Sequence, residues 1–232
     1  MKTERLELDG IPALLWGEPS ERVIVAVHGS QSHKADAPTA LLAARAAARG
    51  GQVLSFDLPG HGDRRGGAPC KAQNGVADLS AVLAYARRGW ARTGLFGNSI
   101  GAYFSLLACR EAPPEEAWFL SPVVDMERLI GNMMSWSGVT PERLEREREI
   151  PTPMGETLYW DDCCWVREHP VCKWEAPTHI LYGAEDALCG REGVEAFARR
   201  FGCDLEVVPG AEHYFHTPAQ LEALAGWLGR TL

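Results

Sequence analysis

The sequence contains no long apolar segment. None of its hydrophobic runs approaches the roughly eighteen residues needed to cross a bilayer, and the polar start MKTERLELDG is unlike a signal peptide. It also lacks any dense block of lysine and arginine, and its net charge is -8. Because nucleic-acid-binding domains are usually basic, we expect neither a nucleic acid nor a membrane as a partner, and we expect a location in the cytoplasm.

A regular cysteine framework is also missing. The seven cysteines are an odd number at irregular spacings, which favours free thiols in a reducing compartment over disulfides. The one local group contains Cys163, Cys164, His169 and Cys172. Two adjacent cysteines do not easily reach one tetrahedral zinc ion, and no CxxC spacing is present. We therefore expect no metal site, and we interpret the cysteines as small apolar fillers.

Repeats, low-complexity tracts and flexible linkers are absent, and 232 residues fit one domain. The chain instead alternates two kinds of segment after an opening hairpin around Asp9-Gly10. Apolar runs that predict strands begin the segments 22–29, 52–62, 92–97, 117–122, 178–183 and 204–210. Patterns that predict helices occupy 37–50, 74–89, 100–110, 191–202 and 217–230. For the second of these helices, we expect Asn74 as the cap and Gly89 as the stop.

This alternation predicts an α/β fold with a mostly parallel sheet and helices on both faces. The alternation breaks between residues 126 and 176, where bulky side chains are frequent. Long insertions in compact domains are often lids. We therefore expect a cap over residues 126–176 on a core made of residues 1–125 and 177–232. Bulky residues in such a cap predict an apolar substrate pocket, and we take Met133, Trp136 and Trp160 as its substrate-binding residues.

A serine lies between two glycines in LFGNSIGAY, residues 95–103. Here an apolar run gives way to helix-forming residues, so Ser99 is expected at a sharp strand-to-helix turn. Gly97 and Gly101 would remove collisions at such a turn and leave the hydroxyl exposed. Chemistry in an open parallel sheet gathers at the carboxyl ends of the strands, and Ser99 falls at such an end. The pattern indicates a nucleophile.

A serine hydroxyl needs a base to take its proton and an acid to orient that base. The predicted strand 178–183 is followed by Glu185-Asp186, and the last predicted strand is followed by His213. We predict His213 as the base and Asp186 as the orienting acid, with Asp125 as the competing acid. His216 abuts the predicted cap of the last helix and is interpreted as a surface or pocket-rim residue.

With these residues, the chain resembles the α/β-hydrolase superfamily over nearly its whole length, especially small carboxylesterase-like serine hydrolases with a short cap. GNSIG matches the family's nucleophile elbow, and Ser99, Asp186 and His213 follow its chain order. The resemblance implies an oxyanion hole made of two backbone N–H groups. One belongs to Ile100, and the other is assigned to Ser30 in VHGS. Such enzymes require no metal and no organic cofactor.

The resemblance implies hydrolysis of carboxylic esters of small, fairly apolar molecules through an acyl-enzyme. Cleavage of thioesters or carbon–carbon bonds uses the same triad, and Asn98 before the serine leaves the carbon–carbon alternative open. A further alternative is a non-catalytic small-molecule receptor of the same fold. We interpret His28 and His61 as structural residues of their turns. The sequence leaves a monomer and a homodimer equally open.

Overall fold

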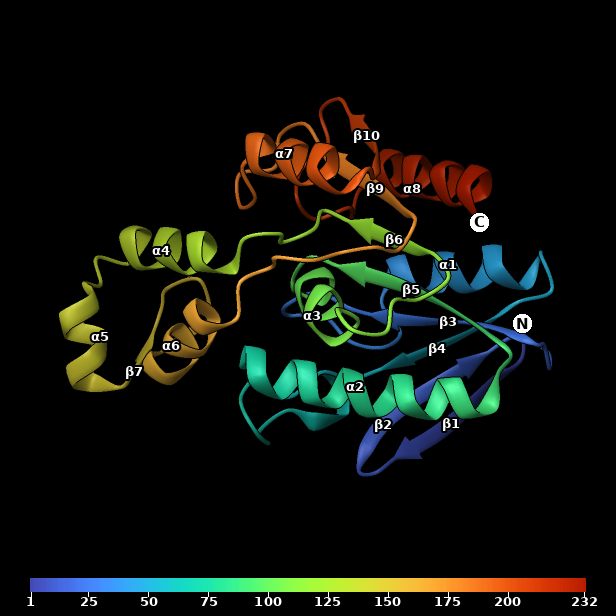
Figure 1. Cartoon of the computed structure of the whole chain (residues 1–232), viewed down its shortest axis with the longest axis horizontal. Helices are drawn as coiled ribbons and strands as arrows, with labels where there is room; N and C mark the ends of the chain where they lie inside the picture. The colour runs from blue at the N-terminus through green and yellow to red at the C-terminus, as the bar shows by residue number, and fades with distance from the viewer.

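An eight-stranded sheet forms the centre of the chain in a computed structural model that describes residues 1–232 (Figure 1). The strands lie in the order β1-β2-β4-β3-β5-β6-β9-β10. Their bounds are β1 Thr3–Leu8, β2 Ile11–Trp16, β3 Arg22–Val27, β4 Gln52–Phe56, β5 Arg92–Asn98, β6 Ala117–Leu120, β9 Thr178–Gly183 and β10 Asp204–Val208. The hairpin β1–β2 is antiparallel and joins β4 antiparallel, whereas β4 to β10 are parallel throughout. The predicted α/β architecture is confirmed.

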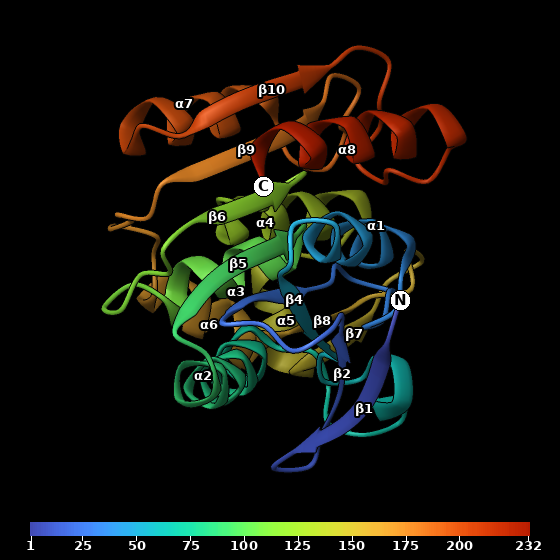
Figure 2. The same ribbon diagram turned by 90° about the vertical axis from the view of Figure 1, so that its right-hand side faces the viewer.

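Helices cover both faces of this sheet (Figure 2). One face carries α1 (Ala37–Ala47) and α8 (Pro218–Thr231), which pack against each other. The other carries α2 (Ala72–Gly89), α3 (Ile100–Ala108) and α7 (Arg191–Phe201). A short 3-10 turn, η1 (Gly62–Arg64), follows β4. The starts of α1 and α8 are capped by Asp36 and Thr217, whose side chains accept N–H groups of the first turn, as helix starts require.

The central strands are buried on both sides. In β3, Val23, Val25 and Val27 face the cluster under α2 and α3, while Ile24 and Ala26 face the cluster under α1 and α8. None of the five is more than 2% exposed. This explains why the strand reads as a continuous apolar run rather than an alternating one.

The start of α2 differs from the prediction. The helix begins at Ala72, with Lys71 at the cap position, and not at Asn74. Asn74 lies inside the first turn and donates from its side chain to the carbonyl of Pro69 at 3.1 Å. Gly89 is the last residue of the helix, as expected. No residue next to α2 in sequence caps its first turn with a side chain.

Residues 126–168 form a separate lobe that lies beyond the carboxyl ends of β5 and β6 (Figure 1). The segment in which the predicted alternation breaks contains α4 (Met126–Trp136), α5 (Pro141–Glu147), the hairpin β7 (Glu149–Pro151) and β8 (Thr157–Tyr159), and α6 (Trp160–Glu168). The lobe has an apolar cluster of its own, made of Met134, Val139, Leu144, Ile150, Leu158 and Cys163. Neither in the lobe nor in the core does any helix combine the length and the apolar character required of a membrane span.

Candidate active site

Ser99 occupies a strained turn between β5 and α3. Its φ is 54° and its ψ is -117°, a backbone conformation that costs an L-residue about 1–3 kcal/mol. The glycines on either side are sterically required. A Cβ at Gly97 would lie 2.7 Å from the Cα of Ala102, and one at Gly101 would lie 2.4 Å from the carbonyl oxygen of Val27. This close packing of α3 on the sheet holds the serine in the turn, together with the hydrogen bond that the N–H of Ser99 donates to the carbonyl of Leu120 at 3.0 Å.

The side chains of Ser99, His213 and Asp186 form a continuous hydrogen-bonded row. The Nε2 atom of His213 lies 2.8 Å from the Oγ of Ser99, and its Nδ1 lies 2.7 Å from Oδ2 of Asp186. An ionised carboxylate only accepts hydrogen bonds, so Nδ1 carries the proton and Nε2 is free to accept one. All three residues are buried. The structure thus brings together the three residues that the sequence singled out.

The carboxylate of Asp186 is fixed from its other side. Its Oδ1 accepts the N–H groups of Leu188 and Cys189, both at 2.9 Å. Asp125 has a different role, because its carboxylate caps α4 by accepting the N–H of Arg128 at 3.0 Å. The geometry therefore pairs His213 with Asp186 and not with Asp125.

His216 lies apart from this row. It is exposed, and its Nδ1 lies 2.7 Å from the carbonyl oxygen of Tyr214. The position agrees with the interpretation as a surface or rim residue, and the histidine that faces the serine is the one at 213.

The loop after β3 lies beside the serine. Ser30 and Ile100 both line the cavity that contains Ser99, and Ile100 is the first residue of α3, where backbone N–H groups have no helical partner. The next N–H along the loop, that of Gln31, is taken by Nε2 of His61 at 3.0 Å. No group of the chain accepts the N–H of Ser30. The two predicted oxyanion donors therefore lie in the same cavity wall as the serine.

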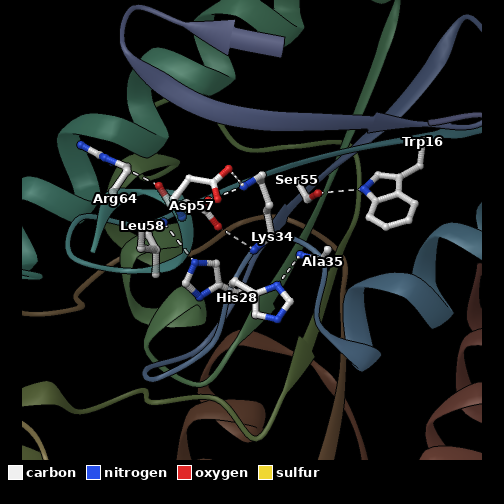
Figure 3. Close-up of polar contacts among 10 residues, drawn as sticks. Trp16, His28, Lys34, Ala35, Ser55, Asp57, Leu58 and Arg64 are labelled. Atoms are coloured by element: carbon white, nitrogen blue, oxygen red, sulfur yellow. Dashed lines mark hydrogen bonds and ion pairs between the residues drawn. The ribbon is translucent and has the colours of Figure 1, made fainter. Parts of the chain in front are cut away.

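His28 and His61 hold this loop in place. The ring of His28 accepts the N–H of Leu58 at Nε2 (Figure 3) and contacts the carbonyl of Gly29 through Nδ1. Burial lowers the pKa of His28 to about 4, which matches a neutral ring that both donates and accepts. His61 contacts the carbonyl of Pro59 through Nδ1 while its Nε2 accepts from the loop. Both histidines serve the backbone, as the sequence interpretation has it.

A buried ion pair reinforces the same region (Figure 3). The carboxylate of Asp57 is fully buried and pairs with the ammonium group of Lys34, which also contacts Asp63 at 2.8 Å. The two carboxylate oxygens of Asp57 also accept the backbone N–H groups of Lys34 and Asp63, each at 2.9 Å. Burial alone raises the pKa of Asp57, but these hydrogen bonds outweigh it and hold the pKa below its ordinary value. The pair ties residues 28–36 to the turn 57–64.

A largely apolar cavity of about 140 Å³ opens next to Ser99. Its walls come from both the core and the 126–168 lobe, and they include Met133 and Trp136 as predicted. Trp160 does not line the cavity. Its ring packs on the apolar cluster of the lobe and lies under the guanidinium of Arg167. The assignment of Trp160 to the pocket is corrected accordingly.

Two carboxylates also line the cavity, and the sequence analysis missed both. Glu156, in the turn between β7 and β8, accepts hydrogen bonds from the hydroxyl of Ser30 and from Nε2 of Gln31. Asp162, in the first turn of α6, accepts the N–H of Ala72 at 2.7 Å and so supplies the cap that α2 lacks. No lysine, arginine or histidine lines this cavity.

Burial sets the charge state of Asp162. The surrounding apolar wall, with a further contribution from the neighbouring Asp161, raises the pKa of Asp162 to about 6. The N–H of Ala72 and the charge of Lys71 act in the opposite direction but do not compensate. Lys71 is itself paired with Asp161 at 2.7 Å. The cavity wall thus contains a carboxyl whose pKa is raised to about 6.

The cysteine group considered from the sequence does not gather around a common point. The one set of three potential ligand side chains within mutual reach is Asp186, Cys189 and His213. Two of these are already joined by a hydrogen bond, and burial raises the pKa of the Cys189 thiol, which opposes the thiolate that a metal would need. The arrangement suits proton transfer rather than metal binding.

Comparisons with known proteins identify the family and the fold. The sequence profile of the family described as serine aminopeptidase, S33, matches residues 18–150. Among solved structures, Est1E from Butyrivibrio proteoclasticus with ferulic acid bound has a TM-score of 0.80 at 20% identity, covering 97% of this chain and 96% of that one. No curated protein sequence matches the chain.

Two further solved structures show the same fold. Alpha/beta hydrolase domain-containing protein 10 from mouse has a TM-score of 0.76 at 15% identity, with 97% of this chain and 96% of that chain covered. An esterase from Pyrococcus furiosus has a TM-score of 0.72 at 18% identity, with 98% and 88% covered. These structures support the architecture, and the family profile supports the hydrolase assignment.

Proposed function

Because the chain belongs to the serine aminopeptidase S33 family of the α/β-hydrolase superfamily, we propose that it hydrolyses carboxylic esters of small, fairly apolar molecules through an acyl-enzyme. The observation that carries the proposal is the row of hydrogen bonds from Ser99 through His213 to Asp186. Without an adjacent base a serine hydroxyl is a poor nucleophile, and the 2.8 Å contact supplies that base.

In the proposed reaction, the Oγ of Ser99 forms a bond to the ester carbonyl carbon while Nε2 of His213 takes its proton. The carbonyl π electrons move to the oxygen, which accepts hydrogen bonds from the N–H groups of Ser30 and Ile100. Such donors are typically worth roughly 3 kcal/mol each in the transition state. The imidazolium, held by Asp186, then protonates the leaving alkoxide as the C–O bond breaks. Water attacks the acyl-enzyme by the same route and restores the serine.

We assign residues 126–176 the role of a cap in this reaction. Their helices and hairpin contribute Met133, Trp136 and Leu158 to the wall of the cavity, so the lobe supplies much of the surface that a bound acyl group would contact. The hairpin also contacts the loop of Ser30 through Glu156. These contacts support a cap that shapes the pocket.

The size and charge of the cavity narrow the substrate. A cavity of about 140 Å³ is close to the roughly 150 Å³ that holds one benzene molecule, which favours an acyl group with one ring or a short chain. Its two carboxylates and its lack of basic side chains disfavour an anionic acyl group. Est1E has been solved with ferulic acid bound, and a one-ring hydroxycinnamoyl ester is therefore a rational test substrate.

A substrate panel tests the proposal. It contains 4-nitrophenyl esters from acetate to octanoate, a methyl hydroxycinnamate, an acyl thioester and an amino-acid 4-nitroanilide. We expect the short-chain and one-ring esters to be turned over fastest, and Ser99→Ala to lower kcat by at least about 10³-fold without lowering the melting temperature. Equal rates for Ser99→Ala and wild type would reject the nucleophile. Binding of the esters without turnover by the wild type would favour the receptor alternative.

A further inference from the structure

Glu156 links the cap to the loop that carries the proposed oxyanion donor. Its Oε1 accepts the hydroxyl of Ser30 and, at 3.1 Å, Nε2 of Gln31. The turn that presents it is fixed locally, because the carbonyl of Glu156 accepts both the N–H and the hydroxyl of Thr152, at 2.7 Å and 2.8 Å. The carboxylate therefore projects from a rigid hairpin onto two consecutive residues of the loop.

The loop needs such support at Gln31. This residue has a φ of 57°, in the left-handed region that costs an L-residue roughly 1–2 kcal/mol. Three contacts hold it there. Its backbone N–H donates to His61, and its side-chain amide donates to the carbonyl of Met154 at 3.0 Å and to Glu156. Two of these three contacts come from the cap hairpin.

We propose that Glu156 is a positioning residue that fixes the Ser30–Gln31 loop from the cap, so that the oxyanion hole is fully formed only while the β7–β8 hairpin is docked. The inference rests on the proposed function, because it assigns the Ser30 N–H to the oxyanion. Loss of the contact would leave the peptide groups on either side of Ser30 held only by His28, which contacts the Gly29 carbonyl, and by His61, which accepts the Gln31 N–H, so that both groups would move more freely. The N–H would then spend only part of its time directed at the reacting oxygen.

The role follows from hydrogen bonding and not from charge. A negative charge close to a developing oxyanion raises the energy of the transition state, so an ionised side chain would be a poor choice for an electrostatic role here. What the loop uses is one oxygen that accepts two hydrogen bonds. A glutamine side chain also offers such an oxygen, and Glu156→Gln should therefore preserve the position of the loop, whereas Glu156→Ala should not.

The experiment compares these two variants with a matched control. Glu149 lies in the same hairpin, is exposed and makes no side-chain hydrogen bond or ion pair, so Glu149→Ala controls for loss of a carboxylate from the hairpin. We measure kcat and KM with 4-nitrophenyl acetate, the melting temperature, and the affinity for phenylboronic acid, which forms a tetrahedral adduct on the serine.

For Glu156→Ala we expect kcat to fall at least tenfold, KM to change less than twofold, and the phenylboronic acid affinity to fall in parallel with kcat. The loss is smaller than the 10²–10³-fold typical of deleting an oxyanion donor, because the donor is displaced rather than removed. The kcat of Glu156→Gln should stay within threefold of the wild-type value. The kcat of Glu149→Ala should equal the wild-type value.

Three outcomes would overturn the inference: Glu156→Ala within twofold of wild-type kcat, a lower melting temperature with unchanged phenylboronic acid affinity, or equal losses for the alanine and glutamine variants. The last would mean that charge, and not the shared acceptor, matters. Failure of the proposed function is separate, because it appears as activity that survives in Ser99→Ala. An enzyme that depends on Ser99 but not on Glu156 rejects this inference alone.

Discussion

Asp162→Asn should make the protein more stable at alkaline pH and have a smaller effect in acid. Burial raises the pKa of Asp162 from 3.8 to about 6 in the folded state. A folded-state pKa above the unfolded one means that stability is fully present below about pH 4 and is lost as the pH rises through 6. About two units at 1.36 kcal/mol each correspond to roughly 3 kcal/mol. Asparagine keeps an acceptor for the N–H of Ala72 but carries no charge.

The assay is urea unfolding of both proteins at pH 4 and pH 8. The quantity of interest is the stability difference between variant and wild type at pH 8 minus the same difference at pH 4, which removes every pH effect common to both proteins. We expect it to be positive, with roughly 3 kcal/mol as its upper value, or about 6 °C in melting temperature for a chain of this length.

A neighbouring residue supplies the control. Asp161 is half-exposed and paired with Lys71, and contacts with that lysine lower its pKa although burial acts against them. For Asp161→Asn the same difference should therefore be opposite in sign and small. A value for Asp162→Asn that is zero within about 0.5 kcal/mol, well inside the ~3 kcal/mol expected, or that is negative, would refute the argument that burial destabilises the charged form.

Three further predictions follow from the packing and the triad. Gly101→Ala should lower the unfolding free energy by about 3 kcal/mol or more, because its Cβ would lie 2.4 Å from a main-chain oxygen at the end of β3. Gly131→Ala, in open space within α4, should raise the unfolding free energy by about 0.5–1 kcal/mol. Urea unfolding measures both changes, and equal effects would contradict the packing argument. Asp186→Asn should reduce kcat by about 10⁴-fold. Asp125→Asn should keep kcat within about twofold of wild type, because asparagine caps a helix equally well. The reverse order of the two losses in steady-state kinetics would reassign the orienting acid. The folded-state pKa of His28 is lowered from 6.5 to about 4. Its contribution to the free energy of unfolding is therefore fully present above pH 6.5, and roughly 3 kcal/mol is lost as the pH falls through 4. In urea unfolding, His28→Asn should show a correspondingly smaller loss of stability between pH 7 and pH 4.

The fold and the three central side chains were predictable because their signals are local. Ser99 is marked by glycines at fixed offsets, and those glycines are required by contacts with the adjacent strand and helix. Asp186 and His213 each follow an apolar strand, and parallel strands bring their carboxyl ends to one edge. The residues next to Ser99, Asp186 and His213 in the sequence are therefore enough to predict where each side chain lies.

Glu156 and Asp162 could not be found in this way. The contact of Glu156 with Ser30 spans 126 positions, and that of Asp162 with Ala72 spans 90. In the sequence, Glu156 follows Gly155 and Asp162 lies between Asp161 and Cys163, and nothing in either stretch indicates a contact with a distant residue. The misplaced start of α2 has the same origin. Asn74 is a good cap by type, but the acceptor that α2 uses comes from another part of the chain.

The N-terminal cap of α2 is the side chain of Asp162, which belongs to the 126–168 lobe, and this has a consequence for the dynamics of the cavity. The first turn of this helix begins with the N–H of Ala72, which is accepted only by Asp162 of the 126–168 lobe. We therefore expect that any movement of residues 126–168 away from the core would fray the amino end of α2, and that the two movements would form one cooperative local unfolding event. Amide hydrogen exchange at the start of α2 should consequently report the rate at which the pocket is exposed, although that helix belongs to the core.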